Sequence, residues 1–491
     1  MPPQEIDYSR KWYVMSAVAM SIFLGTIDGS IVNVALPTLI KELNTNFATV
    51  QWVVLAYLLT ISTLLLSMGR LGDMIGKKPI YISGFIGFTI GSALCGLAPN
   101  VYWLIAFRVL QAVGASMTVA LGTALITEAF PRSERGKALG ISGTIVSVGI
   151  VVGPTLGGLI IDALSWRWIF YVNLPIGIIG TFMAWRFIPN FKPGGRQRFD
   201  YGGAITLFVS LLCFLLALTM GQQLGFGTPL ILALFAGWAV FLIVFIVIEW
   251  RTPQPMIDLR LFKNILFSVN LVTGFISFIA IAGLIILMPF YLEDVLGYPP
   301  LQVGLFMGIV PIGMGVLAPL AGSLSDRFGT RPITVIGLGG MVIGYLAMSS
   351  LTTGTSVPGY ILRLLPVGIG MGVFQSPNNS AIMGSAPRER LGIASGLLSI
   401  TRTLGQVSGI AILGALWASR VIYHHGAILP GGATAAPAAD QVAGLEDTFL
   451  AVSVLVGLGL ALSIWGLVRE RRQQRAQNQS PEAQISPSTG G

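Results

Sequence analysis

The chain has 491 residues, of which 54% are hydrophobic and only 10% charged, whereas about a quarter of the residues of an ordinary soluble domain are charged. Too few polar residues remain to cover a soluble fold of this size, which argues against a soluble enzyme, a disordered chain or a nucleic-acid binder despite the net charge of +9. Cys95 and Cys213 both lie in apolar stretches and indicate neither a disulfide framework nor a metal cluster. The composition predicts an integral membrane protein.

Apolar stretches of about 20 residues recur along the whole chain, and each is long enough for a helix to cross roughly 30 Å of hydrocarbon. Alternation of the kind that a membrane-spanning strand needs is absent, so the predicted class is an all-α integral membrane protein. The 14 predicted spans are 13–36, 47–68, 79–98, 102–125, 138–162, 167–188, 203–221, 229–249, 267–292, 301–324, 332–351, 358–382, 393–419 and 447–468.

The basic residues indicate the orientation. Most of the 29 Lys and Arg residues lie before the first span, after the last span and in every second loop between them. Cytoplasmic loops carry such an excess, so we expect a multi-pass protein of the cell membrane with both termini in the cytoplasm. Arg108, Arg363 and Arg402 lie within predicted spans instead.

An internal repeat predicts the architecture. The segment 69–79, after the second span, matches the segment 322–332, after the tenth, in Gly, Leu, Asp, Gly, a basic residue and Pro at one constant offset. Matching segments at equivalent points indicate two pseudo-symmetric six-helix bundles. The predicted divisions are a cytoplasmic N-terminus 1–12, a first bundle 13–188, an inserted helix pair with its loops 189–266, a second bundle 267–468 and a disordered tail 469–491.

The repeated segments are predicted to be tight cytoplasmic loops that form a gate. Glycines permit the turn and the close approach of helices, and an aspartate can face the positive end of a helix. Topology alone would explain the two lysines, but not an acidic residue and glycines in fixed positions. The predicted gate residues are Gly69, Asp73, Gly76, Lys77 and Lys78, with Asp326, Arg327 and Arg331 in the second segment.

Two intramembrane charges are the predicted proton-coupling site. Asp28 lies about 15 residues, or roughly 23 Å, into the first span, and Arg108 lies near the outer end of the antiparallel fourth span. An unpaired charge at such a depth costs about 2.5–3.5 kcal/mol, so we expect the two to pair or to share a wet cavity. Burial favours the neutral acid and a nearby guanidinium favours the carboxylate, so a change in the cavity would switch proton occupancy. The alternative is a permanent ion pair that only fixes helix packing.

The fifth span carries a stripe without side chains, formed by Gly149, Gly153, Gly157 and Gly158, with Pro154 in its middle. Small residues allow helices to pack closely in a membrane, and proline bends a helix. The stripe predicts a seal between the two bundles that separates and forms again, the alternative being ordinary small-residue packing.

The second bundle has no carboxylate deep within its later spans. Three intramembrane arginines against one aspartate predict poor transport of dications, and tolerance of neutral, monocationic, zwitterionic or anionic amphiphiles. Solvation is expected for Asp162, Glu293 and Asp294 at outer ends and for His424 and His425 in an outer loop. The substrate-cavity candidates are Asn33, Trp52, Tyr57, Gln111, Arg363, Gln375, Asn378, Asn379, Arg402 and Gln406.

Several ordered motifs together resemble a known family. They are the segment 69–79, the segment 28–37 of the first span, Trp52-Val53-Val54 with Tyr57, Arg108-x-x-Gln111-x-x-Gly114, Gly149-x-x-x-Gly153-Pro154-x-x-Gly157-Gly158, and the segment 166–175. Over about residues 13–468 the chain resembles the fourteen-span drug:proton antiporter family of the major facilitator superfamily.

The resemblance implies export of small amphiphilic compounds by alternating access, with protons as the coupling ion, no other cofactor and the bilayer as surroundings. We expect a monomer without a nucleic-acid partner. A uniporter or symporter of a nutrient or metabolite is the alternative within the same fold. A membrane enzyme or sensor is disfavoured, because the sequence offers no catalytic cluster, phosphate loop or additional soluble domain.

Overall fold

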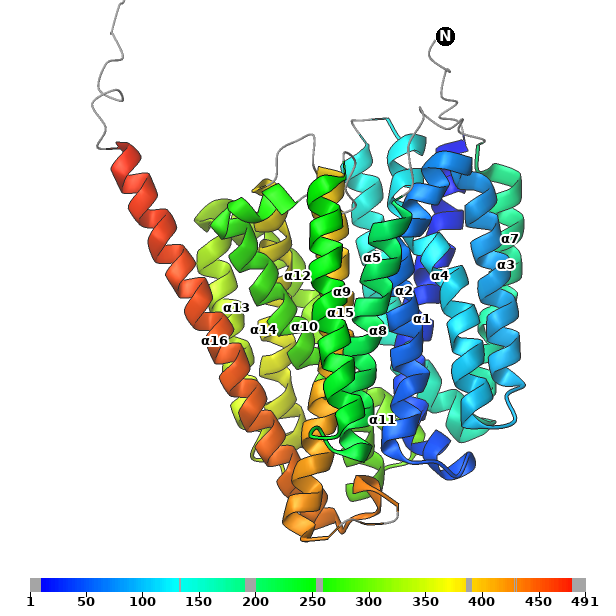
Figure 1. Cartoon of the computed structure of the whole chain (residues 1–491), viewed down its shortest axis with the longest axis vertical. Coiled ribbons are helices and arrows are strands. Elements are labelled where there is room, and N and C mark those ends of the chain that lie inside the picture. Colours follow the sequence, from blue (N-terminus) through cyan, green and yellow to red (C-terminus); the bar gives the residue numbers. More distant parts are fainter. Residues whose placement is uncertain are drawn as a thin grey trace, which may run out of the picture.

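The computed structural model describes residues 10–131, 134–189, 200–252, 259–385, 391–427, 429 and 431–478. Throughout these residues the regular structure is helical, and 14 helices are long and apolar enough to cross a membrane (Figure 1). The predicted all-α membrane class and the number of spans are therefore confirmed.

The helices form two groups separated by an inserted pair. The first group contains α1 (Lys11–Glu42), α2 (Phe47–Ile75), α3 (Lys77–Gly96), α4 (Val101–Ala129), α5 (Arg135–Ala163), α6 (Trp168–Tyr171) and α7 (Asn173–Phe187). The pair is α8 (Tyr201–Leu224) and α9 (Pro229–Arg251), followed by the short η2 (Leu259–Lys263). The second group contains α10 (Ile265–Phe290) with η3 (Tyr291–Val295), α11 (Pro300–Met307), α12 (Ile309–Phe328), α13 (Thr330–Met348), α14 (Val357–Gly384), α15 (Leu391–His425), η5 (Ala433–Ala435) and α16 (Ala438–Asn478).

The two groups repeat one packing scheme. In the first bundle α1 packs against α5, and both α2 and α3 pack against α4; in the second, α10 packs against α15, and both α12 and α13 pack against α14. Figure 1 shows the two bundles side by side. The matching segments of the repeat also have one local geometry, because a single glycine in the left-handed region separates each pair of helices: Gly76 (φ 112°) and Gly329 (φ 88°).

Two elements differ from the sequence prediction. The repeated segments are not loops: residues 69–75 continue α2, and Gly76 alone turns the chain before α3 begins at Lys77. The C-terminal segment from Arg469, predicted to be disordered, continues α16 as far as Asn478. Its Arg, Glu, Gln and Ala residues are good helix formers and extend a helix that has already formed within the apolar span.

The inserted pair lies against one side of both bundles. Helix α8 contacts α2 of the first bundle and α15 of the second, whereas α9 packs chiefly on α8. Within α9 only three side chains are buried, and the others are exposed or partly exposed. Such an apolar but exposed helix is stable when it faces lipid, as we expect for the outer surface of the pair.

The two faces of the membrane protein differ in how the bundles meet. We call the face that holds Lys11 and Asn478 the terminal face and the other the opposite face; the terminal face is at the top of Figure 1. At the opposite face, Lys41 at the end of α1 pairs with Glu293 (2.8 Å) and Asp294 (3.0 Å) of η3. Among the described residues, every ion pair that joins the two bundles lies here.

Aromatic rings and glycines complete this closure. The ring of Phe47, at the start of α2, meets those of Phe290 and Trp417 of the second bundle at 4.9 and 4.8 Å between centroids. A Cβ atom on Gly158 of α5 would lie 2.3 Å from the carbonyl oxygen of Pro300 in α11. The bundles are therefore in direct contact at the opposite face, and this conformer is closed there.

Candidate functional site

The two intramembrane charges predicted to pair lie together in the first bundle. Arg108 Nη1 of α4 donates to Asp28 Oδ2 of α1 at 2.5 Å. Both residues have no exposed surface in this conformer. An isolated charge in such surroundings would be strongly unfavourable, and a directly paired carboxylate and guanidinium compensate each other.

Further donors complete the site around Asp28. Its other oxygen, Oδ1, accepts from Gln111 Nε2 at 2.8 Å and from Asn173 Nδ2 at 3.1 Å. The guanidinium of Arg108 is satisfied as well, because Nε donates to the Val53 carbonyl (3.0 Å) and Nη1 to Gln111 Oε1 (2.8 Å). We call Asp28, Arg108, Gln111 and Asn173 the charge cluster. Helices α1, α4 and α7 contribute its side chains, and α2 supplies the Val53 carbonyl.

Two residues at this site were not predicted as site residues: Asn173 within the charge cluster, and Ser92 beside it. Asn173 Nδ2 also donates to Ser92 Oγ of α3 (3.1 Å), and Ser92 donates to the Phe170 carbonyl (2.8 Å). Asn173 lies within the motif at 166–175. A polar residue in an apolar span was the feature of the sequence that could have identified it as a site residue. Two cavity candidates belong here: Gln111 bonds Asp28, and the ring of Tyr57 covers Arg108 at 3.9 Å.

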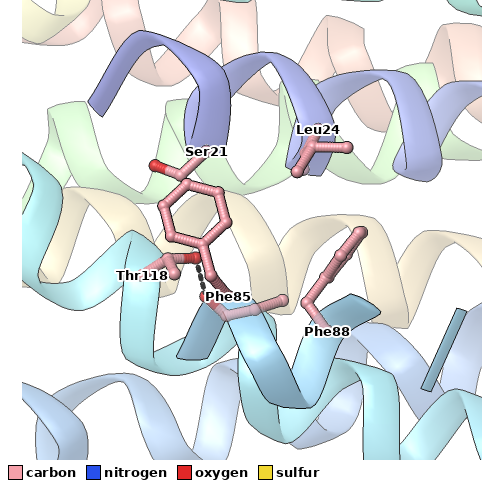
Figure 2. Close-up of a pocket in the computed structure, with 7 residues that line it drawn as sticks. Ser21, Leu24, Phe85, Phe88 and Thr118 are labelled. Atoms are coloured by element: carbon pink, nitrogen blue, oxygen red, sulfur yellow. Dashed lines mark hydrogen bonds between the residues drawn. The ribbon is translucent and has the colours of Figure 1, made fainter. Parts of the chain in front are cut away.

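A small cavity lies about one helical turn from the charge cluster, on its terminal-face side. Its volume is about 10 Å³, close to the space that one water molecule needs. Figure 2 shows the hydroxyl-bearing side chains at one end and Leu24 and Phe88 at the other. The lining comes from α1, α3 and α4: Ser21, Leu24, Gly25, Phe85, Phe88, Ala115 and Thr118.

The glycine stripe of α5 packs on the other side of α1. Cβ atoms on Gly149 and Gly153 would lie 2.0 and 1.8 Å from Thr26 Oγ1 and Ser30 Oγ of α1, and one on Gly157 would lie 2.6 Å from Ile31 Cγ1. Of the five stripe residues, two face the second bundle: Gly158 contacts Pro300, and the carbonyl of Pro154 contacts Gly304. Most of the stripe therefore joins α5 to α1 within the first bundle, where small residues allow the close approach. A seal between the bundles that separates and forms again stays a prediction for Gly158 and Pro154.

The predicted gate residues lie at the terminal face, in two separate groups. Lys77 pairs with Glu128 within the first bundle, and Arg331 Nε pairs with Glu470 Oε2 (2.5 Å) within the second. Arg327 is exposed, with its guanidinium 5.4 Å from the Phe328 ring. The side chains of Asp73 and Asp326 lie outside the described part of the structure, and Gly69 has open space beside it.

The second bundle holds a different set of polar groups. Asn378 Oδ1 and Asn270 Nδ2 are buried without a hydrogen-bond partner among the described residues. The other polar candidates on α14 and α15, Gln375, Asn379, Arg402 and Gln406, are partly exposed. Arg363 differs from the expectation: it lies near the opposite face and bonds Ser350 Oγ (2.9 Å) and the Gly359 carbonyl (2.9 Å). The interior excess of positive charge is thus one arginine, not two.

Two remaining candidates of the first bundle lie on α1 and α2. Asn33 is buried and donates to the Gly29 carbonyl (2.9 Å), while its Oδ1 has no partner among the residues described. Trp52 is partly exposed and packs against the large apolar core.

Charged groups expected to be solvated have partners in most cases. Glu293 and Asp294 have side chains only 11% and 16% exposed and share Lys41, because the contact between bundles covers them. His424 and His425 end α15 and bond Asp447 and Asp440, each at 2.8 Å. Asp162 is exposed as expected.

A helical bundle repeated with pseudo-symmetry, closed at one face and with charges buried inside one half, defines a membrane transporter rather than an enzyme. The sequence model of the Major Facilitator Superfamily matches residues 18–410. The chain belongs to this superfamily, and its 14 spans fit the fourteen-span drug:proton antiporter type.

Relatives support this assignment over most of their length. The chain is 37% identical to the riboflavin transporter RibZ of Clostridioides difficile, covering 84% of this chain and 90% of the relative. It is 32% identical to the multidrug transporter protein MdtP of Bacillus subtilis (85% and 77%) and 33% identical to the multidrug resistance protein Stp of Mycobacterium tuberculosis (83% and 77%). The fold matches that of a bacterial homologue of the human lysosomal transporter Spinster, crystallised inward-facing, with a TM-score of 0.66 at 19% identity over 93% of this chain and 97% of that one.

Proposed function

We propose that this transporter exports small amphiphilic compounds across the cell membrane in exchange for protons, by alternating access between the two bundles. The observation that carries the proposal is the Asp28 carboxylate, which has no exposed surface and is held by one guanidinium and two amides. No cofactor other than the proton is needed. The terminal face is the cytoplasmic one, in keeping with the basic residues there, and the working unit is a monomer.

Protonation of Asp28 would change the charge cluster as a whole. A neutral Asp28 leaves Arg108 with the Val53 carbonyl, Gln111 Oε1 and the Tyr57 ring but without a counter-charge. A buried cation without a counter-charge is unfavourable, so the protonated state favours another arrangement of α1 and α4. The proton thus supplies the differential free energy that a change of conformation requires.

The packing of α1 gives this change a route to the second bundle. One side of α1 carries Asp28, and the other side receives Gly149 and Gly153 of α5 in close contact. The same α5 touches α11 through Gly158 at the opposite face. A shift of α1 relative to α4 therefore displaces a helix that forms part of the closure.

The small cavity supports an exit for the proton toward the terminal face. It holds the volume of one water, and it lies between Asp28 and the buried hydroxyl pair of Ser21 and Tyr81 (2.5 Å). With the opposite face closed, release toward the terminal face is the direction that an inward-driven proton requires.

The relatives suggest two substrate groups. Two of them are named for multidrug transport, which favours broad specificity for amphiphiles. The similarity to a riboflavin transporter favours, as a second candidate, transport of a flavin-like metabolite, with or without proton coupling. The same vesicle experiment separates these possibilities.

The test uses the purified protein in proteoliposomes, with riboflavin and rhodamine 123 as fluorescent substrates. A pH gradient, acidic on the side toward which substrate moves, should drive accumulation by the wild type. Asp28→Asn should lose gradient-driven accumulation at least 100-fold, because the amide cannot exchange a proton. Substrate counterflow without a gradient should remain within a few-fold, since the transport pathway itself is intact.

The matched control is Asp162→Asn, which neutralises an exposed carboxylate of the same bundle and should leave both assays unchanged. If gradient-driven accumulation by Asp28→Asn were as strong as that by the wild type, Asp28 would not be the proton-coupling residue. Wild-type transport whose rate and extent are the same with and without the pH gradient would favour the uniporter alternative.

A further inference from the structure

Within a membrane span of the second bundle, one guanidinium has no ion-pair partner among the described residues. Arg402 lies on α15, about 16 Å along the helix from its start at Leu391, and is partly exposed. Within the described residues, its guanidinium makes no ion pair or hydrogen bond, and the ring of Phe278 lies 5.8 Å from it. Arg108 and Arg331, by contrast, each have a carboxylate partner.

An unpaired cation at this depth is costly. Insertion scales give about 2.5–3.5 kcal/mol for arginine near the centre of a span, and such residues normally pair or serve transport. The face of one phenylalanine recovers only part of this cost. The described residues place no carboxylate against Arg402, so an anion from outside the chain would compensate its charge.

Two buried amides lie on the same side of α10 as Phe278. Asn270, Gly274 and Phe278 are spaced by four residues and therefore share one face of this helix. Asn378 Nδ2 of α14 lies 3.2 Å from the point where a Cβ of Gly274 would be. Asn270 is 4% and Asn378 2% exposed, and Asn270 Nδ2 and Asn378 Oδ1 are unpartnered among the residues described.

We propose that Arg402 is the anchor of a substrate subsite for a single planar anionic group, a carboxylate above all, attached to an aromatic body. The proposal rests on the transport function proposed above and names the substrate class that the second bundle takes. A guanidinium binds a carboxylate through two parallel hydrogen bonds. Phe278 flanks the aromatic body. Asn378, about one helical turn away, and Asn270, about two turns away, offer an acceptor and a donor to polar substituents.

The charges of the surroundings agree with an anion. On α10, α14 and α15, the three helices that form this face, the spans described contain no carboxylate near Arg402. One turn further along α15, Gln406 is partly exposed and unbonded, so it extends the polar strip. A dication would meet an uncompensated positive charge here.

The test measures binding at equilibrium in detergent, with no pH gradient, by fluorescence anisotropy. Two xanthene dyes of similar size serve as probes: fluorescein, which carries a carboxylate, and rhodamine 123, a monocation. Arg402→Gln should weaken fluorescein binding at least tenfold and leave rhodamine 123 binding unchanged or stronger. Arg402→Lys keeps the charge but not the planar donor pair, so fluorescein binding should weaken about threefold.

Arg363→Gln is the matched control, because Arg363 lies in the same bundle with bonds to Ser350 and Gly359; it should change neither affinity more than twofold. Fluorescein affinity that is insensitive to Arg402→Gln, or an equal loss for both dyes, overturns the subsite. Should Arg402→Gln fail to fold, Arg402→Lys decides by the same comparison of dyes. Because no gradient is used, failure here is distinct from failure of proton coupling in the vesicle test.

Discussion

The two bundles share one packing scheme but hold the charges within their membrane spans in opposite ways. In the first bundle, Asp28 and Arg108 satisfy each other, and two amides complete the arrangement with no exposed surface. In the second, Arg402 has no counter-charge among the described residues. Unpartnered amide atoms do not separate the two bundles, because among the residues described they occur on Asn33 and Asn173 of the first as well as on Asn270 and Asn378 of the second. A buried charge that is already paired is suited to an ion as small as a proton, whereas a charge without a counter-charge is suited to a larger ligand that brings one.

This difference assigns the two halves of the repeat to two tasks. In the two proposals above, the first bundle holds the charge that a proton changes, and the second presents groups that a substrate completes. The two halves still share the glycine turns Gly76 and Gly329, which set the packing scheme rather than the polar interior.

The largest expected effect is the difference between Arg108 and Arg402 in how much each contributes to the stability of the fold. Arg108→Gln removes one member of a buried pair, which costs about 3–5 kcal/mol, so the Tm in detergent should fall clearly. Arg402→Gln removes a charge that has no partner and should leave the Tm unchanged or raise it. Thermal unfolding of the two variants, side by side, measures the contrast.

The double variant Asp28→Asn with Arg108→Gln is the control, because removing both charges should recover much of the loss. Equal destabilisation by Arg108→Gln and Arg402→Gln would mean that Arg402 is a structural residue, and the contrast between the bundles would fail.

A second expected effect concerns the amides. Asn173→Leu deletes a hydrogen bond to a charged group, worth about 1.5–3 kcal/mol, and leaves Ser92 without one of its partners. Asn378→Leu removes an amide whose Oδ1 is unpartnered and should cost little in stability. Unfolding in the absence of substrate gives both values; a greater loss for Asn378→Leu would contradict the comparison.

A third effect separates the two contacts of the α5 glycines. Gly158→Leu places atoms where the Pro300 carbonyl lies, and overpacking of this kind costs about 1–3 kcal/mol. Because the contact exists only when the opposite face is closed, the closed population should fall roughly 5–150-fold. Spin labels on Leu43→Cys and Leu296→Cys would report a longer distance.

Gly149→Ala is its counterpart, since the added methyl group meets Thr26 within the first bundle. It should lower the Tm without changing the distance between the labels. If Gly149→Ala opened the face as Gly158→Leu does, the stripe would be one continuous inter-bundle seal after all.

The sequence predicted the fold well because span length and polarity act locally. The count of spans, the repeat and the turn glycines all follow from residues close together in the chain. The end of α16 was missed, because a polar segment after a span resembles a disordered tail until a preceding helix and the Arg331–Glu470 pair support it.

The site was predicted less completely, for reasons of three-dimensional packing. Equal depth brought Asp28 and Arg108 together, but no spacing rule could place Asn173 against the same carboxylate from 145 positions away in the sequence. The direction of a side chain around its helix decided the rest: Gly149 faces α1, and Arg363 faces a loop at the opposite face.

The smallest expected effect concerns the ion pair that joins the bundles. Lys41 is 58% exposed, so water and salt weaken its attraction, and such pairs contribute only about 0.2–1 kcal/mol. Here, however, one ammonium faces both Glu293 and Asp294, which are largely covered. Lys41→Gln leaves the two carboxylates to repel each other, so the effect should lie at the upper end of that range.

The same pair of spin labels measures this prediction. Lys41→Gln should reduce the closed population about fivefold, and added NaCl should weaken closure in the wild type but have little effect in the variant. Lys263→Gln, which neutralises an exposed lysine of η2 at the terminal face, should change neither. Closure that survives Lys41→Gln unchanged would mean that Phe47 with its aromatic partners and the Gly158 contact suffice, and that apolar packing rather than charge holds the opposite face shut.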